Sequence, residues 1–254
     1  MTAPVPTTPT WRQRLCRFIS TDLPATVQAE KKYVWLAHGL FFIPALSMMI
    51  WMGNDPSNFG FFANEATSRT NLLTLYRMVI EATPAQYVWM ISIHLNHVLM
   101  MMIQFLVGGF LLGLGTAASL VNQGLYFGSI LGLSLDLPLP WLFMYHTFYH
   151  GALELLGMML AGASGLRIGI TLLSTCLRKT DFKPGLASAF NLFLGALFFL
   201  VLTLPAGVVF YPLADAHILI KTLFNLLVWV GCYAYLFWPR TPSFPQDPSV
   251  KNHS

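Results

Sequence analysis

Four histidines and one glutamate are spaced so that they could meet inside an apolar helix bundle. Glu154 stands deep in an apolar run, and His146 and His150 precede it at steps of four residues. At about 3.6 residues per turn, these three side chains share one face of a helix over two turns. A charged residue inside a membrane helix is costly, so it usually has a partner and often a role. This face is the first candidate for chemistry.

A second pair of histidines, His94 and His97, stands in an earlier apolar run at positions i and i+3. Counted from the outer ends of the two expected spans, this pair lies at a depth similar to that of the later histidines, at about 1.5 Å per residue. Histidine and carboxylate are the ligands that zinc enzymes use. A zinc site is therefore one interpretation, with the ligands His94, His97, His146, His150 and Glu154.

The other interpretation is a hydrogen-bonded network that neutralises the glutamate and holds the helices together. We favour this network because no compact HExxH motif is present and because polar residues commonly join transmembrane helices. We assign no catalytic residue and expect no cofactor, with zinc as the alternative. The network consists of His94, Asn96, His97, His146, His150 and Glu154.

The composition of the chain indicates an integral membrane protein. Of its 254 residues, 56% are hydrophobic and 9% are charged, and the mean hydropathy is +0.61. Soluble domains carry about 25% charged residues. The net charge of +4 does not indicate nucleic-acid binding, because the basic residues flank apolar runs. Cys16, Cys176 and Cys232 are far apart and show no CxxC spacing, which argues against a disulfide scaffold or a zinc finger.

Six apolar runs approach or exceed the roughly 20 residues that a helix needs to cross a membrane. We predict an all-α polytopic bundle with both termini in the cytoplasm. The positive-inside rule favours this orientation, because it leaves only Arg69, Arg77 and Lys221 of the 14 Lys and Arg on the outer side. The expected spans are Tyr33–Met52, Tyr87–Gly113, Thr116–Leu135, Trp141–Gly165, Leu186–Phe210 and His217–Trp238.

The chain divides into three regions: a cytoplasmic N-terminal segment (1–32), a transmembrane bundle (33–238) with an outer polar segment (53–86), and a cytoplasmic disordered tail (239–254). The N-terminal segment is either a short helix on the membrane surface or a flexible basic tail. The helical interpretation rests on an apolar face opposite a basic face, formed by Trp11, Leu15, Phe18 and Ile19 and by Arg12, Arg14 and Arg17.

Four further features lie in or beside the spans. Asn71–Glu81 could form an amphipathic helix on the outer surface, and Leu166–Leu177 could continue the fourth span along the inner interface. The glycine-rich turn after the second span leaves open that one of the two adjoining segments is re-entrant. Asn122-Gln-Gly124 reads as a polar break in the third span.

Small residues mark expected sites of close helix packing. Gly157, Ala161 and Gly165 follow one another at steps of four residues on the fourth span, and Gly109 and Gly113 lie at the inner end of the second. Small residues at this spacing let helix backbones approach closely. We therefore expect these five positions to be helix contacts.

Five motifs follow one another in the second to fourth spans: an asparagine-bearing helix, a glycine-rich turn, an Asn-Gly break, a His-Gly-x-x-Glu helix and a small-residue run. They read as Asn96, Gly109 to Gly115, Asn122-Gln-Gly124, His150-Gly151-Ala-Leu-Glu154 and Ala161-Gly162-Ala-Ser-Gly165-Leu166-Arg-Ile-Gly169. In these motifs the chain resembles the core of the stage II sporulation protein M family. The family often has a second acid near a proline late in the chain, and the stretch Pro205 to Pro212 has none.

The resemblance implies a multi-pass protein of the bacterial cytoplasmic membrane. The sporulation member works in a complex that remodels the cell wall, as a membrane anchor and not as the hydrolase. Relatives also occur beside genes for peptide-antibiotic export and immunity. We therefore expect a non-catalytic scaffold or recruitment subunit that binds the lipid bilayer and other membrane or cell-envelope proteins, with no nucleic acid.

Two other functions stay open from the sequence. One is a permease-like component of a peptide or lipid export or immunity system, and the other is a metal-dependent intramembrane hydrolase. The phosphate-binding motif GxxxxGK[ST] is absent from the sequence, so pumping would need an ATPase partner. A second copy of the chain is a further candidate partner.

Overall fold

The computed structural model describes residues 10–54, 83–135, 151–178, 181–210 and 218–238. Within these ranges the chain forms helices and no strands, which confirms the all-α fold class. The long helices are α3 (Lys31–Asn54), α5 (Pro84–Gly108), α6 (Leu114–Leu135), α8 (Gly151–Arg178), α9 (Phe182–Phe210) and α10 (Ile218–Phe237). Each of them falls on one of the six apolar runs of the sequence.

Three helices of the described ranges are long and apolar enough to cross a membrane. They run over Lys31–Asn54, Ala152–Leu177 and Phe182–Thr203, and shorter apolar helices cover Ser92–Gly108 and Leu226–Phe237. The chain is thus a helical membrane protein, and the number of six crossings stays a prediction. The expected helical continuation through Leu166–Leu177 is confirmed, because α8 runs without interruption to Arg178 and its apolar stretch extends to Leu177. The end of the membrane crossing near Gly165 stays a prediction.

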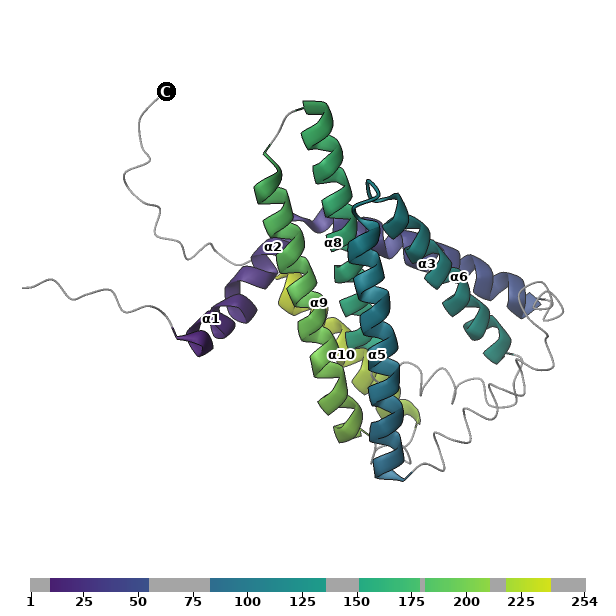
Figure 1. Ribbon diagram of the computed structural model, residues 1–254. Coiled ribbons are helices and arrows are strands. Elements are labelled where there is room, and N and C mark those ends of the chain that lie inside the picture. Colours follow the sequence, from purple (N-terminus) through teal and green to yellow (C-terminus); the bar gives the residue numbers. More distant parts are fainter. Residues whose placement is uncertain (1–9, 55–82, 136–150, 179–180, 211–217, 239–254) are drawn as a thin grey trace, which may run out of the picture.

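Helix α8 lies at the centre of the bundle (Figure 1). Between Ala152 and Gly169 every side chain position is buried except Leu153 and Arg167, which are half-buried. Helix α9 packs against α8 in the antiparallel direction, and the hydroxyl of Ser164 donates to the backbone carbonyl of Ala189 at 2.7 Å. Helix α8 therefore packs against other helices on nearly all of its faces.

Helices α3 and α6 form a second unit that diverges from α5, α8 and α9, as Figure 1 shows. The two helices run side by side in the same direction, since Gly124 of α6 packs on Phe41 of α3 and Gly132 packs on Met52. Helix α6 passes through the polar break at Asn122-Gln-Gly124 without interruption. Glycine at position 124 instead lets α6 approach the backbone of α3.

The segment before α3 is helical and is attached to the bundle. It comprises α1 (Trp11–Arg17), the π-helical turn η1 (Phe18–Asp22) and α2 (Leu23–Ala29). Leu23 and Val27 of α2 are fully buried in the main hydrophobic core, and the Gln28 side chain donates to the carbonyl of Trp238 at 2.7 Å. A flexible tail is therefore wrong for residues 11–29, whereas the membrane-surface position of α1 stays a prediction.

Several predictions fall outside the described residues. They concern most of the outer polar segment with its helix Asn71–Glu81, the first part of the fourth span, and the C-terminal tail. The ranges concerned are 1–9, 55–82, 136–150, 179–180, 211–217 and 239–254.

Candidate functional site

Glu154 and His94 form a pair between α8 and α5. The Nε2 atom of His94 and the Oε2 atom of Glu154 share a hydrogen bond of 2.9 Å. The Glu154 side chain is 11% exposed and that of His94 is 45% exposed. A carboxylate this well buried would be costly without a partner. The histidine therefore stabilises the glutamate and also ties α5 to α8.

The other residues of the expected network have different positions. Asn96 and His97 are exposed on α5. His146 and His150 lie outside the described residues. Among the residues that the structure describes, His94 and Glu154 of the predicted network are in direct contact, and the rest of the network stays a prediction.

The zinc interpretation needs at least three ligands close together. Within the described ranges, no three His, Cys, Asp or Glu side chains form a group that could hold a metal ion. Two of the five ligands considered, His146 and His150, lie beyond these ranges. The zinc site stays a prediction.

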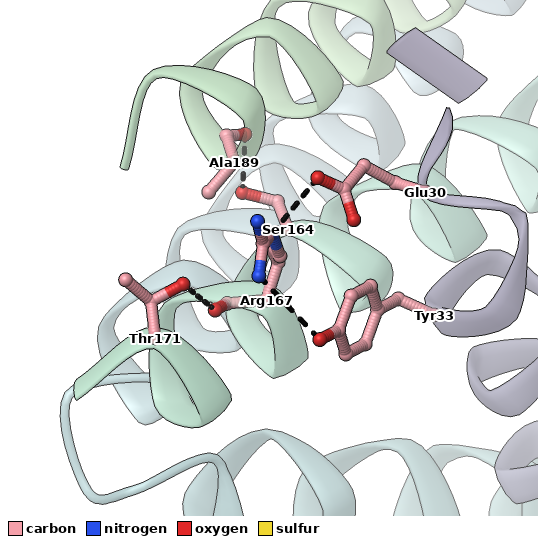
Figure 2. A network of polar contacts seen from close by, with 6 residues as sticks. All are labelled: Glu30, Tyr33, Ser164, Arg167, Thr171 and Ala189. Atoms are coloured by element: carbon pink, nitrogen blue, oxygen red, sulfur yellow. Dashed lines mark hydrogen bonds and ion pairs between the residues drawn. The ribbon is translucent and has the colours of Figure 1, made fainter. Parts of the chain in front are cut away.

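A second polar centre, which the sequence did not lead us to expect, joins α8 to the start of α3 (Figure 2). Nε of Arg167 lies 2.9 Å from Oε1 of Glu30, and the Glu30 side chain is 8% exposed. The guanidinium also lies over the ring of Tyr33, 5.4 Å from its centroid, and its Nη1 is 3.5 Å from the Tyr33 hydroxyl. The positive charge inside α8 is thus neutralised by a carboxylate from the N-terminal segment.

The sequence held a weak signal for this centre. Arg167 lies within the small-residue run of α8 and is counted with the basic residues of the cytoplasmic side, and Glu30 directly precedes Lys31 and Lys32. The two residues are 137 positions apart.

Glu154 and Arg167 are separated by 13 positions of one helix, about 20 Å at 1.5 Å per residue. Helix α8 therefore makes two polar side-chain contacts with other segments, one near each end of its buried stretch.

The glycines of α8 contact the backbone of α5 and the turn that follows it. A methyl group on Gly165 would lie 2.1 Å from the carbonyl oxygen of Phe105, and one on Gly109 would lie 2.4 Å from the carbonyl oxygen of Gly165. Gly113, at φ +81°, lies against Gly169. Because these contacts advance together along both helices, α5 and α8 run in the same direction.

The remaining packing positions of the sequence analysis lie on α8. A methyl group on Gly157 would lie 2.8 Å from the methyl end of Met102 and 3.1 Å from the carbonyl oxygen of Ala196. Ala161 is fully buried. Gly157 is thus placed between α5 and α9, with a flexible side chain on one side.

A row of glycines on α6, which we did not predict as a packing row, makes equally close contacts. Methyl groups on Gly124 and Gly128 would lie 2.2 and 2.1 Å from the carbonyl oxygens of Phe41 and Ala45. With Gly132, these residues recur at steps of four, the spacing that lets two helix backbones approach. The periodicity was visible in the sequence, but its partner helix was not.

The chain matches a protein-family model described as stage II sporulation protein M over residues 38–209. The matched range contains the His94–Glu154 pair and Arg167, and it begins after Glu30. No curated protein and no solved structure matches the chain.

Proposed function

The chain belongs to the stage II sporulation protein M family, and on that premise we propose that it is a non-catalytic, multi-pass scaffold or recruitment subunit of the bacterial cytoplasmic membrane. Its partners are the lipid bilayer and other membrane or cell-envelope proteins. Its two buried carboxylates in the described ranges serve to connect helices, and the bundle presents its outer surface for assembly.

The observation that carries this proposal is that both buried glutamates, Glu154 and Glu30, contact other helices. Glu154 binds His94 of α5, and Glu30 binds Arg167 of α8. Both contacts join segments that are far apart in the sequence, as expected of polar groups that act between transmembrane helices. This supports a role in fixing the bundle.

The directions of the helices support six crossings with both termini inside. If each apolar run crosses the membrane, successive spans point in opposite directions. The first span is then parallel to the third, the second is parallel to the fourth, and the fourth is antiparallel to the fifth. The contacts of α3 with α6, α5 with α8, and α8 with α9 have these directions. The excess of basic residues on one side then assigns that side to the cytoplasm.

The experiment that tests the proposal compares Glu154→Gln with a packing variant in the producing bacterium. A photo-crosslinking amino acid at Ile43, an exposed position of α3, captures the neighbours of the chain in native membranes. We expect a cell-envelope protein to be captured by the parent and by Glu154→Gln, because the amide keeps the shape and hydrogen-bonding capacity of the carboxyl group. Gly165→Leu, which disrupts the α5–α8 contact, should lose the capture.

Each rival function gives a different result. An ATP-binding subunit as the captured partner would favour the permease-like component. Stoichiometric zinc in the parent, lost in Glu154→Gln, would favour the hydrolase, because a neutral amide is a poor zinc ligand. Either result would replace the scaffold proposal.

A further inference from the structure

The turn between α5 and α6 has an unusual surface. Phe110, Leu111, Leu112 and Leu114 are all large and apolar, and they are between 47% and 73% exposed. Turns that face water are usually built from Gly, Pro, Asn, Asp and Ser. No Lys, Arg, Asp or Glu occurs anywhere between residues 84 and 135, although cytoplasmic loops are normally enriched in Lys and Arg. The side chains of this turn are therefore suited to an apolar environment.

Much of the backbone of the turn is paired within the turn itself. The N–H groups of Gly109, Phe110, Leu111, Gly113 and Leu114 each donate to a carbonyl three or four residues earlier, at 3.0 to 3.2 Å. The hydroxyl of Thr116 donates to the carbonyl of Phe105 at 2.6 Å. Backbone that contacts hydrocarbon has to pair its polar groups internally, since lipid offers no donors or acceptors. The five paired N–H groups and the paired carbonyl of Phe105 therefore need no partner from water.

Leu112 in the turn combines an apolar side chain with an unfavourable backbone conformation. Leu112 has φ +54°, the left-handed region that glycine and asparagine adopt far more readily than leucine. In water, Asn or Gly would serve this position at least as well. A leucine here provides an apolar side chain at the expense of a less favourable backbone conformation.

The turn is held on one side and open on the other. Gly109 and Gly113 lie against Gly165 and Gly169 of α8. Beyond Gly169, the apolar stretch of α8 continues for eight residues to Leu177, about 12 Å at 1.5 Å per residue. Figure 1 shows that end of α8 extending past the turn. Arg167 is paired with Glu30 and so adds no unpaired charge beside the turn.

We propose that the α5–α6 turn is inserted into the acyl chains of one leaflet, on the side of Lys31 and Lys183. The occupant of its exposed surface is lipid hydrocarbon. The inserted side chains anchor the ends of α5 and α6 at a fixed depth, while the glycine contacts fix them to α8. This inference requires only a membrane bundle and is independent of the scaffold function.

A fluorescent probe at Leu111 tests the environment of the turn. Cys16, Cys176 and Cys232 are first replaced by serine or alanine, and Leu111→Cys is labelled with an environment-sensitive dye. The full-length protein is reconstituted into phosphatidylethanolamine–phosphatidylglycerol vesicles, with or without doxyl-labelled acyl chains. Ile43→Cys on exposed α3 is the lipid-facing control, and Lys183→Cys is the water-facing control.

We expect doxyl lipids to quench the Leu111 probe about as strongly as the Ile43 probe, and we expect iodide to quench it several-fold less than the Lys183 probe. Strong quenching by iodide would overturn the proposal, because it would place the turn in water. Protection from both quenchers would also overturn it, since a second copy or another protein would then cover the turn. Only variants that elute like the parent in detergent are compared, so that a folding defect is not scored as exposure.

Discussion

Gly165 stands where α8 crosses α5, so one added methyl group there tests the packing of the bundle. This methyl group would lie 2.1 Å from the carbonyl oxygen of Phe105 and 2.4 Å from the hydroxyl oxygen of Thr116. Ordinary carbon–oxygen contacts begin at about 3.3 Å. The two helices would have to separate locally by roughly 1 Å to accept Gly165→Ala.

The expected loss of stability follows from three contributions. Overpacking costs about 1–3 kcal/mol, and weakening the hydrogen bond from Thr116 to Phe105 costs about 1 kcal/mol. Alanine is favoured over glycine in a helix by about 1 kcal/mol, which offsets part of this cost. We expect Gly165→Ala to lower the free energy of unfolding by about 2 kcal/mol. For a chain of this size, that corresponds to a decrease in Tm of roughly 4–8 °C.

Thermal unfolding of the detergent-solubilised protein, followed by size-exclusion chromatography of heated samples, measures this change. Two glycine variants serve as controls. Gly231→Ala meets no atom within 4 Å, and Gly157→Ala meets first the flexible end of Met102 at 2.8 Å. Tm should decrease in the order Gly231→Ala, Gly157→Ala, Gly165→Ala. A Gly165→Ala protein as stable as Gly231→Ala would refute the close contact between α5 and α8.

Three further predictions concern charges and topology. Glu30→Ala leaves Arg167 without its carboxylate and should lower the free energy of unfolding by about 2–3 kcal/mol, less than for a fully buried pair because the arginine is partly exposed. In the same thermal assay, the double variant Glu30→Met/Arg167→Met should recover stability, and a double variant that does not would count against a direct pair. Glu154→Ala should lower the free energy of unfolding by about 1–3 kcal/mol, whereas Glu154→Gln should have a Tm near that of the parent. Elemental analysis that finds zinc in the parent and not in Glu154→Gln would contradict the structural role. A cysteine placed between Asp55 and Glu81 should react with an impermeant reagent from outside the cell and one at Lys183 should not, and the reverse pattern would invert the predicted orientation.

The sequence by itself determined the class of the protein and the positions of its long helices. A membrane requires about 20 apolar residues per crossing and leaves few backbone conformations besides the helix. Apolar runs in this chain therefore had to become helices, and α3, α5, α6, α8, α9 and α10 fall on them. The cost of a buried carboxylate likewise made it predictable that Glu154 would have a partner.

Tertiary structure alone decided which groups meet. Glu154 binds His94 of α5, whereas His97, one turn further along α5, has an exposed side chain. Arg167 binds Glu30 from the N-terminal segment, and the glycine row of α6 packs on α3. Helical periodicity defines a face, but the rotation, depth and crossing angle of two helices determine what that face contacts. Those quantities depend on every neighbour of both helices at once, so they are not contained in any local stretch of sequence.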